Sequence, residues 1–334
     1  MKKLAVLIVM LFVFNLIGVF AVDKEQADAW IDLVGEKDLQ VKMQKLEAYY
    51  NKYGDKEDRN SIYMYLHLAE TTYLLQQYEK TIQFGEKALT YKDIEAGHKL
   101  RLYLYLANAY NLTKKDMDKA YSYTEQLIEL AKSLRSETLN NSTIDNNFTA
   151  PALRIQVQLL TAKQDPESIK KAFNKAIEAF QVDKSEKSAN FVLALSERML
   201  KNGKVEDAIH GVEIINQNKP TAEYYRLLGM WYNHLKNSEK AIENLKASYQ
   251  LKKNAKVAYD LGVLLNQAQN LDGALDYLAE SYLLNDEKYS PDALKLFEHL
   301  VFFEKMKGQP QAEQERVYNE ILAAAKARLG ITLP

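Results

Sequence analysis

The chain has 334 residues, of which 47% are hydrophobic, and its few glycines and prolines (12 and 6) favour a helical protein. The 44 Lys and Arg residues balance 45 Asp and Glu residues, for a net charge of −1, and no basic stripe stands out, so we do not expect nucleic acid as a partner. The absence of cysteine excludes disulfides, thiolate metal sites and cysteine-linked lipid anchors.

The N-terminus predicts an export signal. Two lysines at positions 2 and 3 precede an apolar run from Leu4 to Ala21, and Val19 and Ala21 are small enough for the −3 and −1 positions of a signal-peptidase site. We therefore expect residues 1–21 to be a signal peptide cleaved after Ala21, and the protein to be exported to the periplasm or another extracytoplasmic compartment. An uncleaved anchor is the alternative, because the 18-residue run could just span a bilayer. That segment would then be the chain's contact with a membrane.

The next part of the chain predicts helical pairs. Residues 22–54 predict an N-terminal pair, and residues 62–134 predict two helical repeats, because apolar residues recur there at helical spacing. Residues 135–150 are rich in Asn, Ser and Thr, which indicates an exposed polar loop. Residues 151–181 predict a degenerate helical pair broken at Asp165-Pro166, where the proline fits the first turn of a new helix.

Residues 189–288 contain a periodic pattern of small residues. Ser196, Gly229 and Gly262 are 33 residues apart, and Ala208, Ala241 and Ala274 repeat in step with them. Small residues at two recurring positions let paired helices approach closely, and this pattern is typical of stacked helical hairpins. Residues 291–330 predict a final pair that caps the stack.

One of these units carries a family resemblance. Tyr225-x2-Leu228-Gly229-x2-Tyr232, followed by Ala241, resembles a tetratricopeptide repeat (TPR), with Tyr in place of the usual Trp. Five units, this one included, agree in phase. The resemblance implies an all-α fold, a right-handed α-solenoid of stacked helix-turn-helix hairpins, in an exported, bacterial-type repeat protein.

The resemblance also implies a groove, because in that family the first helix of each repeat lines the concave face at fixed positions. Asparagine amides in such a groove can hydrogen-bond a peptide backbone whatever its side chains. Arg226 and Lys256 would supply charge for an acidic group of the partner. The candidate partner-binding residues are Tyr63, Glu70, Tyr73, Arg101, Asn108, Asn111, Asn190, Glu197, Arg226, Met230, Asn233, Lys256, Tyr259 and Asn266.

No catalytic or metal-binding motif is found in the sequence. The histidines lack metal-site spacing, and we expect them to be separate surface or interface residues: His67, His98, His210, His234 and His299. Nucleophile-elbow and calcium-loop patterns are also missing. We therefore expect no enzyme activity, no cofactor and no metal.

The sequence predicts a non-catalytic scaffold of the cell envelope that holds a protein or peptide partner along the concave groove. One alternative is a solute-binding accessory component of an envelope transport system, which would need a closed apolar pocket. Another is an enzyme with an atypical site near residues 136–150, which would need titratable groups to converge in one cavity.

Overall fold

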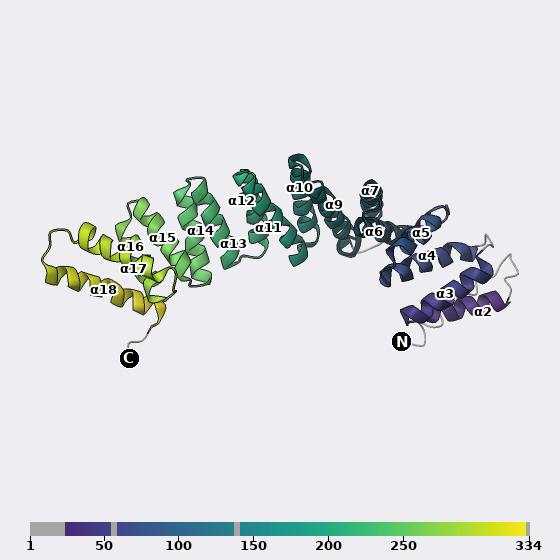
Figure 1. Ribbon diagram of the computed structural model, residues 1–334, viewed down its shortest axis with the longest axis horizontal. Coiled ribbons are helices and arrows are strands. Elements are labelled where there is room, and N and C mark those ends of the chain that lie inside the picture. The colour runs from purple at the N-terminus through teal and green to yellow at the C-terminus, as the bar shows by residue number, and fades with distance from the viewer. Residues whose placement is uncertain (1–23, 55–58, 137–140, 332–334) are drawn as a thin grey trace. The chain divides into compact units, whose positions relative to one another are not determined.

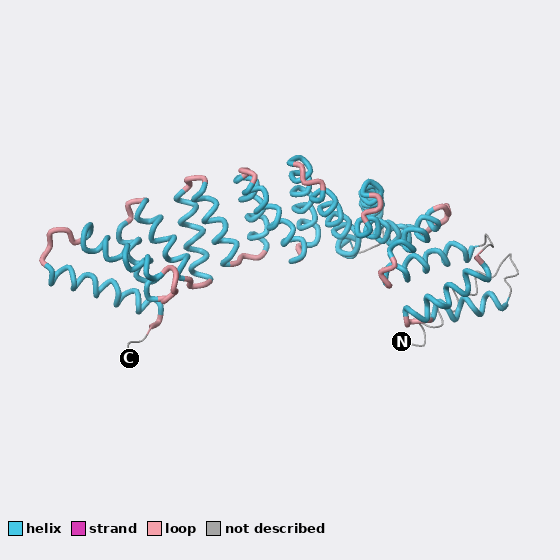
Figure 2. Tube along the Cα trace, viewed as in Figure 1, coloured by secondary structure: helices cyan, strands magenta, loops and turns pink. Residues whose placement is uncertain are grey.

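The computed structural model describes residues 24–54, 59–136 and 141–331, and within these ranges the chain is helical and contains no strand (Figures 1 and 2). It divides into two compact units, one up to Leu159 and one from Leu160. The predicted signal peptide of residues 1–21 lies outside the described residues. Among the residues that are described, no helix has both the length and the apolar character needed to cross a bilayer.

The first unit consists of helical hairpins. Helices α2 with α3, α4 with α5, and α6 with α7 pack as consecutive pairs. A last helical stretch follows, made of a short helix, a π-helical turn and α9, which runs across the boundary between the units. The bounds are α2 Lys24–Gly35, α3 Leu39–Tyr53, α4 Arg59–Leu74, α5 Tyr78–Leu89, α6 Ala96–Thr113, α7 Met117–Ser133, a 3₁₀ turn Leu134–Ser136, α8 Asn141–Ile144, the π-helical turn Asp145–Thr149, and α9 Ala150–Ala162.

The second unit has the same construction. Helices α11 with α12, α13 with α14, and α15 with α16 pack as pairs, α10 packs on α11, and both α17 and α18 pack on α16. The bounds are α10 Pro166–Asp183, α11 Glu186–Lys201, α12 Val205–Asn218, α13 Ala222–His234, α14 Ser238–Leu251, α15 Ala255–Gln267, α16 Leu271–Leu283, α17 Ser290–His299, a π-helical turn Leu300–Lys305, and α18 Gln311–Leu329.

The recurring small residues lie where the two helices of a hairpin cross. A Cβ atom on Gly262 would come within 2.5 Å of Leu278 Cγ and 3.2 Å of the Ala274 carbonyl oxygen on the facing helix. Gly229 makes the equivalent approach to the helix that carries Ala241. A side chain at these positions would push the helices apart, so the small residues set their close approach. The predicted all-α fold of stacked TPR-like helix-turn-helix hairpins is confirmed.

The turns inside the hairpins also repeat. Gly203, Lys236 and Gln269 are 33 residues apart, and each adopts a left-handed backbone, with φ of 74°, 59° and 61°. This conformation reverses the chain in few residues after the first helix ends. After two of these turns the second helix begins at a side-chain cap: the Asn237 carboxamide oxygen accepts the Lys240 N–H at 3.1 Å, and that of Asn270 accepts the Gly273 N–H at 3.0 Å.

Tyrosines at the packing positions join neighbouring hairpins. The Tyr110 hydroxyl on α6 donates to Glu86 on α5 at 2.6 Å, and Lys119 Nζ on α7 donates to the same carboxylate at 2.7 Å. The lysine also lies 5.4 Å from the tyrosine ring centre. In the second unit the corresponding residues are Tyr232, Glu213 and Lys240. In these two hairpins the tyrosine–glutamate bond ties the first helix to the second helix before it, α6 to α5 and α13 to α12.

The prediction of a polar loop at residues 135–150 is wrong for residues 141–149, which are helical. Ile144 is buried in the cluster that contains Leu127, and Phe148 packs there one turn later, so an apolar pair anchors the helix. Pro151 cannot donate a backbone hydrogen bond, and its ring disfavours the regular α-helical turn before it. The Ala150 N–H accordingly bonds to the Asp145 carbonyl in a π-helical turn.

Candidate functional site

The predicted groove residues lie on first helices in both units. Six are in the first unit, on α4 and α6, and eight are in the second unit, on α11, α13 and α15. The structure brings most of the first group into direct contact with one another or with immediate neighbours.

A row of aromatic and amide side chains runs across α4, α6 and α9 in the first unit. The Tyr73 and Tyr105 rings are stacked, with centres 4.4 Å apart. Asn108 Nδ2 donates to the Tyr73 hydroxyl at 2.6 Å, and Asn111 Nδ2 donates to Gln158 Oε1 on α9 at 2.8 Å. The three helices α4, α6 and α9 are therefore connected by polar groups, and all of these groups are partly accessible.

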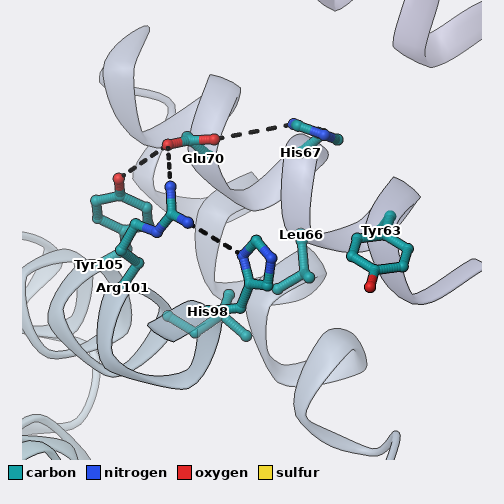
Figure 3. Close-up of a pocket in the computed structure, with 8 residues that line it drawn as sticks. Tyr63, Leu66, His67, Glu70, His98, Arg101 and Tyr105 are labelled. Atoms are coloured by element: carbon teal, nitrogen blue, oxygen red, sulfur yellow. Dashed lines mark hydrogen bonds and ion pairs between the residues drawn. The ribbon is translucent and has the colours of Figure 1, made fainter. Parts of the chain in front are cut away.

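A small pocket opens between α4 and α6, with a volume of about 50 Å³ (Figure 3). Each helix contributes four residues at spacings that place them on one helical face. They are Tyr63, Leu66, His67 and Glu70 from α4, and His98, Arg101, Leu102 and Tyr105 from α6. Three of these, Tyr63, Glu70 and Arg101, belong to the predicted groove set.

Glu70 is at the centre of the polar contacts in this pocket. Its carboxylate accepts a hydrogen bond from the Tyr105 hydroxyl at 3.2 Å. Arg101 Nη1 lies 3.8 Å away, and His67 Nδ1 lies 3.9 Å away. Arg101 also places Nη2 at 3.3 Å from His98 Nδ1, as Figure 3 shows. One carboxylate is thus surrounded by a phenol, a guanidinium group and an imidazole.

Burial keeps both imidazoles neutral near pH 7. It lowers the pKa of His67 to about 4, and it also lowers the pKa of His98. Burial and the adjacent Glu70 raise the pKa of the Tyr105 hydroxyl, which therefore stays protonated and able to donate.

The expectation that the histidines are separate is wrong for His67 and His98, which line the same pocket. Neither occupies a groove position in the family pattern, so the resemblance misses them. His67 precedes Glu70 by three residues, and His98 precedes Arg101 by three. That shared helical spacing places each histidine beside a predicted groove residue once α4 and α6 are known to be neighbours.

In the second unit, the two predicted groove cations are already paired. Arg226 binds Glu223 through two hydrogen bonds, at 2.6 and 2.9 Å, and Lys256 binds Asp260 at 2.7 Å. Each of these acidic partners is one helical turn away on the same helix, and the prediction that the two cations bind an acidic group of a partner stays a prediction. The remaining predicted residues of this unit lie on the same three helices, half-buried at Tyr259 and Asn266 and exposed at Met230, Asn233, Asn190 and Glu197.

The size of the pocket favours a guest no larger than the end of a side chain. Its volume of about 50 Å³ is small beside the roughly 300–1,000 Å³ of typical small-molecule sites. Across the described residues, no group of three or more His, Asp or Glu side chains is arranged to hold a metal ion.

Comparison with known proteins found no matching family model and no matching curated protein. Solved structures do match. A tetratricopeptide repeat protein from Parabacteroides merdae is 14% identical, with 84% of this chain and 98% of that chain covered and a TM-score of 0.39. YrrB, described as a TPR protein with an unusual peptide-binding site, is 16% identical, with 67% and 97% covered and a TM-score of 0.38. PilF of Pseudomonas aeruginosa is 15% identical, with 70% and 91% covered and a TM-score of 0.34.

These structures are TPR proteins or helical repeats similar to this chain, but at such identities and TM-scores they say nothing about its activity. The description of this chain as TPR-like is based on its own repeat spacing, hairpin crossings and turns.

Proposed function

We propose that this TPR-like chain is a non-catalytic scaffold of the cell envelope that holds an extended segment of a partner protein along its first helices. The observation that carries the proposal is the row of partly accessible aromatic and amide groups on α4, α6 and α9. Helical repeats use such continuous faces to present long binding surfaces.

The chemistry of the row suits a peptide backbone. Asn108 and Asn111 each donate one Nδ2–H within the protein, which leaves a carbonyl oxygen and a second N–H on each amide. A peptide main chain presents the complementary N–H and C=O groups at every residue except proline. The internal bonds orient the amides before binding. Little side-chain conformational entropy is therefore lost when the partner binds.

The proposed location is supported by the sequence alone. The apolar run of residues 4–21 after two lysines has the form of an export signal. A scaffold exported in this way would meet its partner outside the cytoplasm.

Selection of binders from a random peptide library, with purified residues 22–334 as the target, tests the proposal. The double variant Asn108→Leu/Asn111→Leu removes both amides from the row. We expect the selected peptides to bind it about 30-fold more weakly, because two hydrogen bonds worth about 1 kcal/mol each are lost.

The matched control is Gln83→Leu, which makes the same amide-to-leucine change at an exposed position of α5. Peptides that bind the double variant and the wild type equally well would refute the proposed surface. Loss of binding in the Gln83 variant as well would show that the effect is not local to the row.

A further inference from the structure

The pocket between α4 and α6 has a carboxylate at its centre and aromatic rings as its walls. Tyr63, His67, His98 and Tyr105 all line it around Glu70, and the Tyr63 and His98 rings meet edge to face at 5.8 Å. The Glu70 side chain is 31% exposed, so a guest can reach it. The carboxylate attracts a cation by charge, and tyrosine rings add to this attraction where they present their negative faces.

Arg101, the cation among the residues that line this pocket, is loosely held. Arg101 is 45% exposed, and its distance of 3.8 Å from Glu70 exceeds the 2.7–2.9 Å of a charge-assisted hydrogen bond. Arg226, by contrast, binds Glu223 through two bonds at 2.6 and 2.9 Å, and Arg328 binds Asp276 at 2.9 Å. An exposed pair at the longer distance contributes little, and the contact of Arg101 Nη2 with His98 Nδ1 is exposed and 3.3 Å long, so Arg101 can leave Glu70 at small cost.

We infer that this pocket receives a positively charged group of the bound chain, with Glu70 as its counter-ion and Arg101 as a built-in competitor. The inference rests on the function proposed above. The group is a lysine or arginine side chain or an N-terminal amine, because these share the required charge. The volume of about 50 Å³ fits the end of one side chain, since a water molecule takes about 30 Å³ in the liquid.

Neutral imidazoles are part of this recognition, because protonated rings would repel the guest. The charged and titratable groups that face them are Lys42, Glu70 and Arg101 with His98 around His67, and Glu70, Glu95 and Arg101 around His98. A bound cation further disfavours protonation of both rings. Affinity therefore falls as the pH drops through the lowered pKa of His98, and it stays constant from pH 6.5 up to the pH at which the guest loses its own charge, about 8 for an N-terminal amine.

Two substitutions of opposite effect test the inference. Peptides selected from the library are measured by fluorescence anisotropy against the wild type, Glu70→Gln and Arg101→Gln. We expect Glu70→Gln to weaken binding of basic peptides about 10-fold or more, because it removes the counter-ion. Arg101→Gln should tighten binding roughly 2- to 5-fold, because it removes a competitor held by a weak ion pair. Glu79→Gln, at an exposed position of α5, is the matched control and should change nothing.

An anionic guest gives the opposite signs, tighter with Glu70→Gln and weaker with Arg101→Gln, and that result overturns the inference. Selected peptides without basic residues or a required free amine also overturn it. Replacing each peptide lysine by Nε-acetyl-lysine, and separately acetylating the N-terminus, identifies which amine enters the pocket. These arms use the wild-type protein, so the test stands even if a variant fails to fold.

Failure of the inference can be told from failure of the proposed function. If Asn108→Leu/Asn111→Leu loses binding while Glu70→Gln and Arg101→Gln do not change it, the peptide surface stands and the cation pocket is refuted. If none of these variants affects binding, both proposals fail.

Discussion

The close approach of α15 and α16 makes a quantitative prediction about Gly262. An added methyl group would lie 2.5 Å from Cγ of Leu278, a fully buried side chain, and 3.2 Å from the Ala274 carbonyl oxygen. Overpacking of this kind costs about 1–3 kcal/mol, while replacing a helical glycine by alanine returns up to about 1 kcal/mol of helix propensity. Gly262→Ala should therefore lower the free energy of unfolding by about 1–2 kcal/mol.

Urea denaturation followed by tryptophan fluorescence measures this effect. The chain has two tryptophans, Trp30 in the first unit and Trp231 in the second, so a Trp30→Phe background leaves Trp231 to report on the second unit. Gly97→Ala in α6, read from Trp30 in a Trp231→Phe background, is the matched control. It meets nothing within 4 Å and should stabilise the protein slightly.

A double variant separates the clash from other effects. Leu278→Ala alone should cost about 2–5 kcal/mol because it empties a core position. In that background Gly262→Ala no longer meets the leucine, so its effect should change from destabilising to stabilising, a coupling of roughly 1–3 kcal/mol. A Gly262→Ala variant that is stabilised as much as Gly97→Ala would refute the close crossing of the two helices.

The remaining predictions concern one ion pair and one histidine. Arg328→Ala should destabilise the second unit by about 2 kcal/mol, because Glu280 on α16, 3% exposed, loses a direct cationic partner. Arg316→Ala, which removes only surface pairs within α18, should leave stability nearly unchanged, and equal losses in the two variants would contradict this reasoning. Burial lowers the pKa of His67 to about 4, against 6.5 in the unfolded chain. The neutral ring therefore contributes fully to the free energy of unfolding above pH 6.5, and this contribution is lost as the pH falls toward 4. Urea midpoints of the first unit between pH 7 and 5 should therefore decrease in the wild type and decrease less in His67→Phe; equal slopes would count against a buried neutral imidazole.

The repeat architecture could be predicted from the sequence because its signals are local. The 33-residue spacing of Ser196, Gly229 and Gly262 identifies the hairpins, and the helix-start signal at Asp165-Pro166 is where α10 begins, with the Asp165 carboxylate capping Ser168 N–H at 2.8 Å. Each of these features depends on residues within one or two helical turns, or on a repeat of the same unit, so periodicity reveals them.

Segment 141–149 shows where local composition failed. Its Asn and Thr residues favour turns in isolation, but burial of Ile144 and the contact of Phe148 with the same cluster outweigh that preference. The packing of Ile144 and Phe148 against the rest of the unit stabilises this helix, and the polar composition of the segment does not indicate that packing.

The contacts of the candidate site also required the tertiary structure. Helical phase placed Tyr63, Glu70 and Arg101 on the first helices, but it could not show that His67 and His98 meet at one pocket, or that Arg226 is neutralised by Glu223. Side chains about 30 residues apart become neighbours only when two first helices pack side by side, and their distances depend on how closely those helices approach. The sequence by itself thus determined the repeating hairpins and their spacing, whereas tertiary packing decided the helical state of residues 141–149 and which groups surround Glu70.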